Sequence, residues 1–172
     1  QLDSFVIGRC PKTLLLNNFV YGSRAGMRFI DDEGGSSGQV INFCPDFVGI
    51  FVGATGIEGL DIVNWMGTNR GGTLQATGKG GKLRVFNANL QGGGEITIEG
   101  GQREVLAQQV RCGRAIVNGG RVELENSFLS GGLTVGKGIE KAQLGDALDR
   151  QCGGGRRRLR RQRRRHHRGG QR

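Results

Sequence analysis

Residues 59–64 read Gly59-Leu-Asp-Ile-Val-Asn64, and this pattern recurs along the chain about every 22 residues. Each copy ends in an asparagine or glutamine, and the positions two and four residues before that anchor are almost always apolar. The anchors are Asn18, Asn42, Asn64, Asn87, Gln109 and Asn126. Alternation with a period of two is typical of β-strands. The repeat therefore predicts a solenoid of stacked parallel coils.

The anchor column predicts an internal asparagine ladder. Asparagine side chains hydrogen-bond neighbouring backbone and tolerate left-handed backbone angles, so they suit a turn that repeats in every coil. The residue after the anchor is aromatic in three successive coils, at Phe19, Phe43 and Trp65, which predicts an internal aromatic stack. We therefore expect Trp65 in the core rather than on a sugar-binding surface. The coil from Gln109 to Asn126 has only 17 residues and needs a short turn.

The sequence divides into three parts. Residues 1–138 carry the coils, and residues 139–152 are expected to form an irregular coil or a short capping helix. Residues 153–172 are rich in arginine and predict a disordered basic tail. Within the coils, residues 31–38 contain no apolar side chain and predict a loop.

The charge of the protein is concentrated in this tail. Ten of the 25 basic residues lie in residues 156–172, which leaves 15 basic residues against 15 acidic ones elsewhere. Nucleic-acid binding would therefore depend on the tail alone. The tail is equally open to interpretation as a sorting signal or as the product of a shifted reading frame. His166 and His167 make a poor metal site, because two adjacent histidines provide few ligands.

The cysteines do not form a metal or redox motif. Cys10, Cys44, Cys112 and Cys152 are far apart and include no C-x-x-C pair. We expect them to be small buried side chains, with a disulfide as the alternative if two of them stack in adjacent coils. No apolar run is long enough to span a membrane, so no membrane association is expected.

The coil motifs resemble the right-handed parallel β-helix proteins of the pectate lyase and polygalacturonase superfamily. The motifs are Asn17-Asn-Phe-Val-Tyr-Gly22, Gly26-Met-Arg-Phe29, Gly38-Gln-Val-Ile-Asn-Phe43, Gly59-Leu-Asp-Ile-Val-Asn64 and Val122-Glu-Leu-Glu-Asn-Ser-Phe-Leu-Ser-Gly131. The resemblance implies an all-β, right-handed, single-stranded parallel β-helix of six to seven coils. It also implies a carbohydrate-binding module that binds or processes polysaccharide, as a fragment of a larger secreted or cell-surface protein. The chain is expected to be inactive alone.

A hydrolase is one alternative function. Asp31 and Asp32 supply the paired aspartates that the polygalacturonase pattern contains, and two carboxyl groups with different pKa values can act as acid and base. However, the Gly-His-Gly of that pattern is replaced by Gly53-Ala-Thr-Gly56, without a histidine. In a polar segment such acids more often form a solvated turn.

A lyase is the second alternative. It needs acids that hold calcium against a substrate carboxylate and a basic side chain that removes the neighbouring proton. Asp61 and Arg84 occupy the same column of adjacent coils, beside Gln39, so we expect them to be neighbours on the outer face. A simple ion pair explains the same arrangement. No cofactor is expected, except calcium if the protein is a lyase.

A structural or adhesive solenoid is the third alternative. The column immediately before the anchors contains the apolar residues Ile41, Val63 and Phe86 on a face that should be external. Such a stripe predicts a cover. The cover is either the segment 139–150 or missing chain within the molecule, or else a homotrimer or protein partner.

Overall fold

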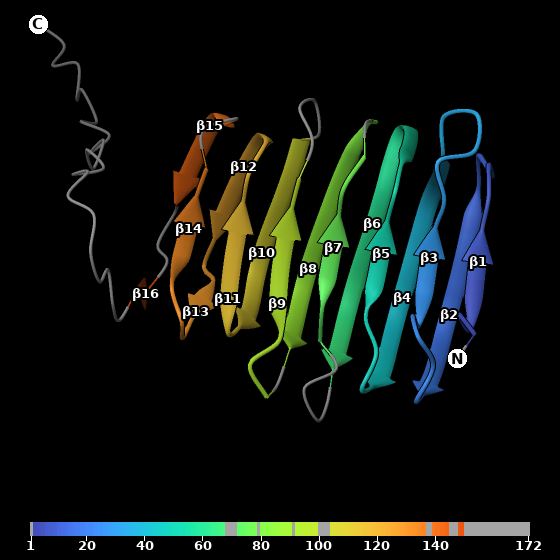
Figure 1. The fold of residues 1–172 in the computed structure, drawn as a ribbon, viewed down its shortest axis with the longest axis horizontal. Coiled ribbons are helices and arrows are strands. Elements are labelled where there is room, and N and C mark those ends of the chain that lie inside the picture. Colours follow the sequence, from blue (N-terminus) through green and yellow to red (C-terminus); the bar gives the residue numbers. More distant parts are fainter. Residues whose placement is uncertain are drawn as a thin grey trace, which may run out of the picture.

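The computed structural model describes residues 2–67, 72–78, 80–90, 92–99 and 104–136, together with the strands at 139–144 and 148–149. The chain winds between two stacks of parallel strands, one in front of the other (Figure 1). The front stack, sheet A, consists of short strands in the order β1 (Phe5–Ile7), β3 (Met27–Phe29), β5 (Ile50–Val52), β7 (Leu74–Ala76), β9 (Glu95–Ile98), β11 (Arg114–Val117) and β14 (Leu133–Val135).

The second stack, sheet B, contains the long strands. Its order is β2 (Thr13–Tyr21), β4 (Ser36–Asp46), β6 (Thr55–Gly67), β8 (Lys82–Leu90), β10 (Glu104–Cys112), β12 (Gly120–Glu125) and β15 (Ile139–Leu144). β13 (Phe128–Leu129) pairs with β10 and with β16 (Leu148–Asp149). The all-β parallel solenoid of about six turns, with about 22 residues per turn, is thus confirmed.

The anchor residues bend the strands of sheet B. Asn42, Asn64, Asn87, Gln109 and Asn126 all have positive φ angles, between 47° and 56°. The left-handed conformation disfavours most side chains, and asparagine is among the residues that adopt it with least penalty. The amide of Asn64 donates to Asn42 at 3.1 Å and the amide of Asn87 donates to Asn64 at 2.9 Å. The predicted ladder is therefore present across these coils.

The prediction for the first rung was wrong by one residue. Asn17, with φ of 53°, adopts the left-handed conformation, and its Oδ1 accepts the amide hydrogen bond of Asn42 at 2.8 Å. Asn18 instead pairs in register with Phe43. A shift of one residue exchanges the two faces of a strand. Leu14, Leu16 and Phe19 consequently point outward and are 59%, 50% and 68% exposed.

The core lies between the two sheets. The residues two and four positions before each anchor point inward. The left-handed anchor changes the alternation, so the residues one and three positions after it also point inward. Trp65 is buried, as predicted, and its ring lies 5.9 Å from that of Phe43. The aromatic stack therefore has two members, since Phe19 lies outside it. The short 17-residue coil is also confirmed, because Gly113 alone separates β10 from β11.

Two further expectations need correction. The loop predicted for residues 31–38 ends earlier, because β4 begins at Ser36 and the side chains of Ser36 and Ser37 are buried between coils. The segment at 139–144 does not cover the apolar stripe of sheet B, since β15 pairs with the edge of β12 and continues the sheet.

Some expectations concern residues outside the described ranges. Cys152, the histidine pair and the arginine-rich tail of residues 153–172 belong to this group. Among the described residues, Cys10, Cys44 and Cys112 are free thiols. No helix in the described part of the chain is long and apolar enough to cross a membrane.

Candidate functional site

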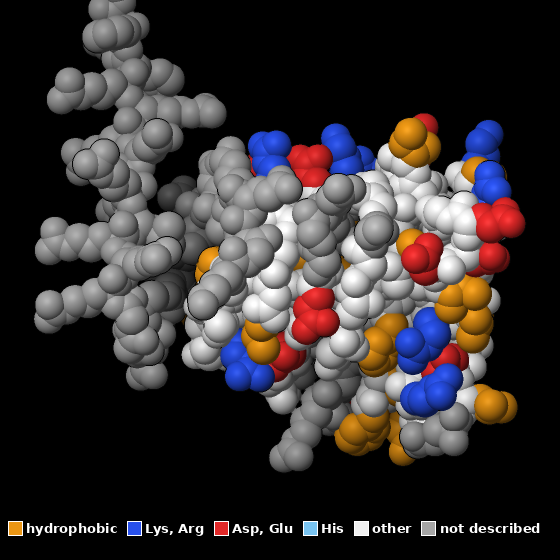
Figure 2. Space-filling model, turned by 45° about the horizontal axis from the view of Figure 1, so that its top comes forward, with side chains coloured by type: hydrophobic (Ala, Val, Ile, Leu, Met, Phe, Trp, Pro, Cys, Tyr) orange, Lys and Arg blue, Asp and Glu red, His pale blue; other side chains and the backbone are white. Residues whose placement is uncertain are grey.

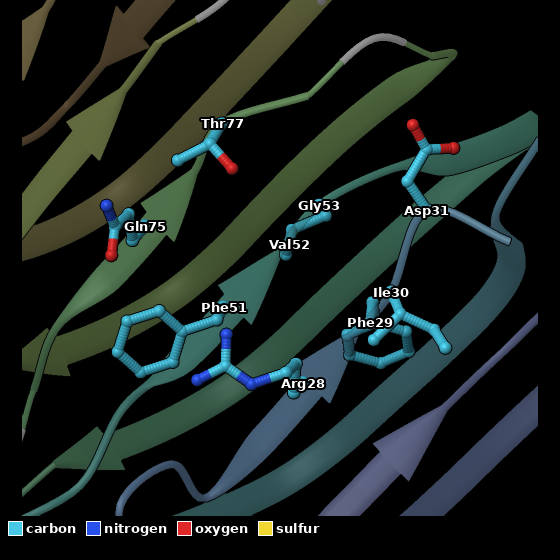
Figure 3. A pocket seen from close by; sticks show the side chains of 9 residues that line it. All are labelled: Arg28, Phe29, Ile30, Asp31, Phe51, Val52, Gly53, Gln75 and Thr77. Atoms are coloured by element: carbon cyan, nitrogen blue, oxygen red, sulfur yellow. The ribbon is translucent and has the colours of Figure 1, made fainter.

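A surface hollow of about 300 Å³ lies on the outer face of sheet A. Its floor is built from the middle residues of three adjacent strands, Arg28 of β3, Phe51 of β5 and Gln75 of β7, which are register partners. Their neighbours along each strand point into the core, so these side chains point to solvent. Asp31 and Thr77 line the hollow where β3 and β7 end (Figure 3).

The guanidinium of Arg28 lies over the ring of Phe51, with its central carbon 4.7 Å from the ring centroid. A cation over an aromatic face is attracted by the electron-rich ring. Gln75 lies on the opposite side of Phe51 from β3, in the next coil. The three coils thus present a cation, an apolar ring and an amide in a row along the solenoid axis (Figure 3).

Asp3 holds Arg28 in place. The Nε of Arg28 donates to Asp3 at 2.7 Å, and Arg24 donates two further hydrogen bonds to the same carboxylate, each of 2.9 Å. The Asp3 side chain is only 3% exposed. The hydrogen bonds from Arg24 and then Arg28 hold the pKa of Asp3 well below its ordinary value. Because one acid faces two bases, this cluster keeps a net positive charge beside the hollow.

The surface view shows the same grouping. Basic and hydrophobic side chains lie together at the N-terminal end of the molecule, on the right of Figure 2. Apart from Asp31, the residues that form the hollow were not among the site residues predicted from the sequence. A periodic signal was nevertheless present, because the triplets Met27-Arg-Phe29, Ile50-Phe-Val52 and Leu74-Gln-Ala76 recur at intervals of 23 and 24 residues. Each triplet has one variable residue between two apolar ones.

The predicted pair of aspartates occupies two different surroundings. Asp31 lines the hollow, whereas Asp32 accepts a hydrogen bond of 3.4 Å from the backbone amide of Arg9 in the preceding coil. Glu33 forms a 2.9 Å ion pair with Arg9, and both side chains are mostly exposed. Exposed ion pairs contribute little to stability. This segment is an exposed turn with one carboxylate at the hollow.

Asp61 and Arg84 are neighbours, as their spacing predicted. They are register partners on β6 and β8, Gln39 lies beside Asp61, and the Nε of Arg84 donates to Asp61. This ion pair lies on the outer face of sheet B, while Asp31 follows a strand of sheet A. The structure therefore does not bring the four candidate catalytic residues into one site, and their catalytic roles stay predictions.

Metal binding by the residues that the structure describes would require several ligand side chains close together. Within those ranges, no group of three or more histidine, cysteine, aspartate or glutamate side chains lies together. Asp31 is the only carboxylate among the residues that line the hollow. A calcium ion prefers six to eight oxygen ligands, so this lining alone offers it few.

Comparison with known proteins gives no family. No protein-family model matches the chain, and neither a curated protein nor a solved structure matches it. The parallel β-helix fold is established by the structure, whereas membership of the pectate lyase and polygalacturonase superfamily stays a prediction.

Proposed function

We propose that this β-helix binds a polysaccharide chain across the outer face of sheet A and does not cleave it. The observation that carries the proposal is the row formed by Arg28, Phe51 and Gln75 along the floor of the hollow. Ligand sites combine apolar or aromatic surface with a few polar groups that fix orientation. Arg28 covers one face of the Phe51 ring, so the row offers a sugar the remaining exposed part of this half-buried ring, with an amide and a guanidinium for its hydroxyl groups.

The repeat of the solenoid supports an extended ligand rather than a compact one. Successive coils place equivalent side chains about 4.8 Å apart. A polymer that lies along the axis meets a new outward side chain at every coil. Thr97 of β9 continues the row beyond Gln75. The hollow is small for a drug-sized ligand, at the lower limit of about 300 Å³, so the bound chain extends beyond it.

The lining of the hollow favours binding over hydrolysis. Glycoside hydrolysis needs two carboxyl groups on opposite sides of the scissile bond, about 5 to 10 Å apart. The hollow is lined by one carboxylate, Asp31, because Asp32 is bonded to the preceding coil. A lyase needs a base near a bound cation, and Arg28 is already hydrogen-bonded to Asp3. These residues suit recognition better than acid and base chemistry.

The test is calorimetric titration of the whole chain with neutral and acidic polysaccharides, accompanied by assays for reducing ends and unsaturated products. We expect Phe51→Ala to weaken binding at least tenfold. Phe86→Ala is the matched control, because Phe86 is also an outward, half-buried phenylalanine but lies on sheet B. Both variants keep the arginine-rich tail, so its charge cannot explain a difference between them.

Three results would overturn the proposal. They are the absence of binding to every polysaccharide from a folded sample, equal effects of the two phenylalanine variants, and product formation by the wild-type chain. Product formation would return the hydrolase and lyase alternatives to first place.

A further inference from the structure

The outer face of sheet B carries an apolar stripe in its central rows. Leu16, Ile41, Val63 and Phe86 are register partners on β2, β4, β6 and β8. Leu16 is 50% exposed and the other three are half-buried. The strand β15 continues the sheet beside β12, so this segment, among the residues that the structure describes, does not cover the face. Contiguous apolar patches of this kind often mark interaction sites.

The charges at the centre of the same face are paired with each other. Arg84 donates to Asp61, and these two residues lie two positions before Phe86 and Val63 on the same strands. Further along, Gln108 donates to Glu125 at 2.5 Å. Charges that already have partners cost less to remove from water than isolated ones. The face can therefore be covered without leaving an unpaired ion at its centre.

We propose that a second copy of this chain docks its own stripe on this face, around a twofold axis that is parallel to the strands and passes between β6 and β8. That position is the middle of the six strands β2, β4, β6, β8, β10 and β12. The rotation places β6 of one copy over β8 of the other. Val63 then packs against Phe86 of the second copy, and Asp61 lies opposite Arg84 of the second copy.

The arrangement is self-complementary because the acid and the base stand on the two strands that flank the axis. A twofold contact uses the same patch on both subunits, so each residue on one side must suit its symmetry mate on the other. Here the two ion pairs form a group of four alternating charges beside an apolar centre. This match of charge to itself is the reason for choosing a second copy as the occupant.

The size of the face predicts a weak, reversible dimer. Six strands at about 4.8 Å each span about 29 Å, and the five residues of each strand before the bend span about 16 Å. Each copy thus covers about 450 Å², or about 900 Å² in total, below the roughly 1,200 Å² of stable interfaces. We expect dissociation in the micromolar range or weaker.

The test is sedimentation velocity of the whole chain over a wide concentration range at physiological salt. We expect a monomer–dimer equilibrium that Phe86→Lys weakens at least tenfold, because a lysine at the centre of the interface has no partner. Ile116→Lys is the matched control, since Ile116 is an outward, half-buried residue on sheet A. Far-UV circular dichroism verifies that each variant is folded.

A charge swap tests the position of the axis. Arg84→Asp brings four acids together across the dyad and should weaken the dimer at least tenfold, and adding Asp61→Arg should restore it. A monomer at every concentration would overturn the proposal, as would a trimer, equal effects of the two lysine variants, or a swap that fails to restore association in a folded protein. The polysaccharide proposal concerns the other sheet and does not depend on these results.

Discussion

Replacement of Asn64 by alanine measures the contribution of one rung of the ladder. Asn64 accepts a hydrogen bond from Asn87 at 2.9 Å and donates one to Asn42 at 3.1 Å. Each hydrogen bond contributes about 0.5 to 1.5 kcal/mol net. Because the Asn64 side chain is exposed, we expect each of the two bonds to contribute in the lower half of that range. The φ of 55° adds a cost for alanine of about 1 kcal/mol. The free energy of unfolding should therefore fall by about 2 to 3 kcal/mol.

Glycine at the same position separates the two contributions. Asn64→Gly loses the same hydrogen bonds but has no Cβ, so the left-handed conformation costs it nothing. We expect a loss of about 1 to 2 kcal/mol, smaller than for alanine. Asn89→Ala is the control, because Asn89 faces outward on the same sheet without belonging to the ladder. Its effect should stay within about 0.5 kcal/mol.

The assay is urea unfolding followed by tryptophan fluorescence. Trp65 is the single tryptophan of the chain and is buried in the core, so its emission reports loss of the coil stack. Equal losses for Asn64→Ala and Asn64→Gly would refute the backbone argument. Losses within about 0.5 kcal/mol for both would show that the ladder hydrogen bonds add nothing to stability.

Three further predictions follow from individual sites. In the folded protein the pKa of Asp3 lies below its ordinary value of 3.8. The stabilisation by the ionised carboxylate is therefore complete above pH 3.8 and is lost as the pH falls below 3.8. The difference in unfolding free energy between wild type and Asp3→Asn should accordingly shrink when urea titrations are repeated at acid pH. Burial raises the pKa of Cys112 to about 12, whereas hydrogen bonds lower the pKa of Cys10. Because the thiolate is the reactive form, mass spectrometry should find Cys10 alkylated before Cys112, and equal alkylation rates would contradict this. Asn17→Ala should remove the hydrogen bond that the side-chain amide of Asn42 donates, whereas Asn18→Ala should leave it intact. The chemical shift of the Asn42 side-chain amide protons in NMR spectra distinguishes the two cases. The opposite result would identify Asn18 as the anchor.

The fold was predictable because the repeat combines two independent signals. Alternating apolar positions indicate strands, and a single recurrent asparagine indicates where each coil turns. The first coil was misassigned where both signals fail together. Leu14, Leu15 and Leu16 give no alternation, and Asn17 and Asn18 offer two anchors. Only the pairing with Asn42 decides between them, and that pairing is a tertiary contact.

The hollow was less accessible to sequence reasoning because its strands are short. A three-residue strand has one outward side chain, so a motif search has no alternation to follow. The environment of Arg28 also depends on Asp3, which lies 25 residues earlier. Arg28 lies in the coil motif Gly26-Met-Arg-Phe29, which indicates a coil but no binding site, and Asp3 lies in none of the coil motifs. Their proximity follows only from the stacking of the first coil on the second.

The period of the solenoid limits which candidate residues can act together. Residues separated by about one period share a column, as the 23 residues between Asp61 and Arg84 show. The 30 residues between Asp31 and Asp61 exceed one period by roughly a third of a coil, and Asp61 lies on sheet B whereas Asp31 follows a strand of sheet A. A catalytic group built from Asp31 would therefore have to use residues near positions 9, 53 or 77, where the chain offers Arg9, Gly53 and Thr77. None of these three residues supplies a second carboxylate, and Arg9 is already paired with Glu33, which is the strongest reason from the repeat to treat the hollow as a binding surface.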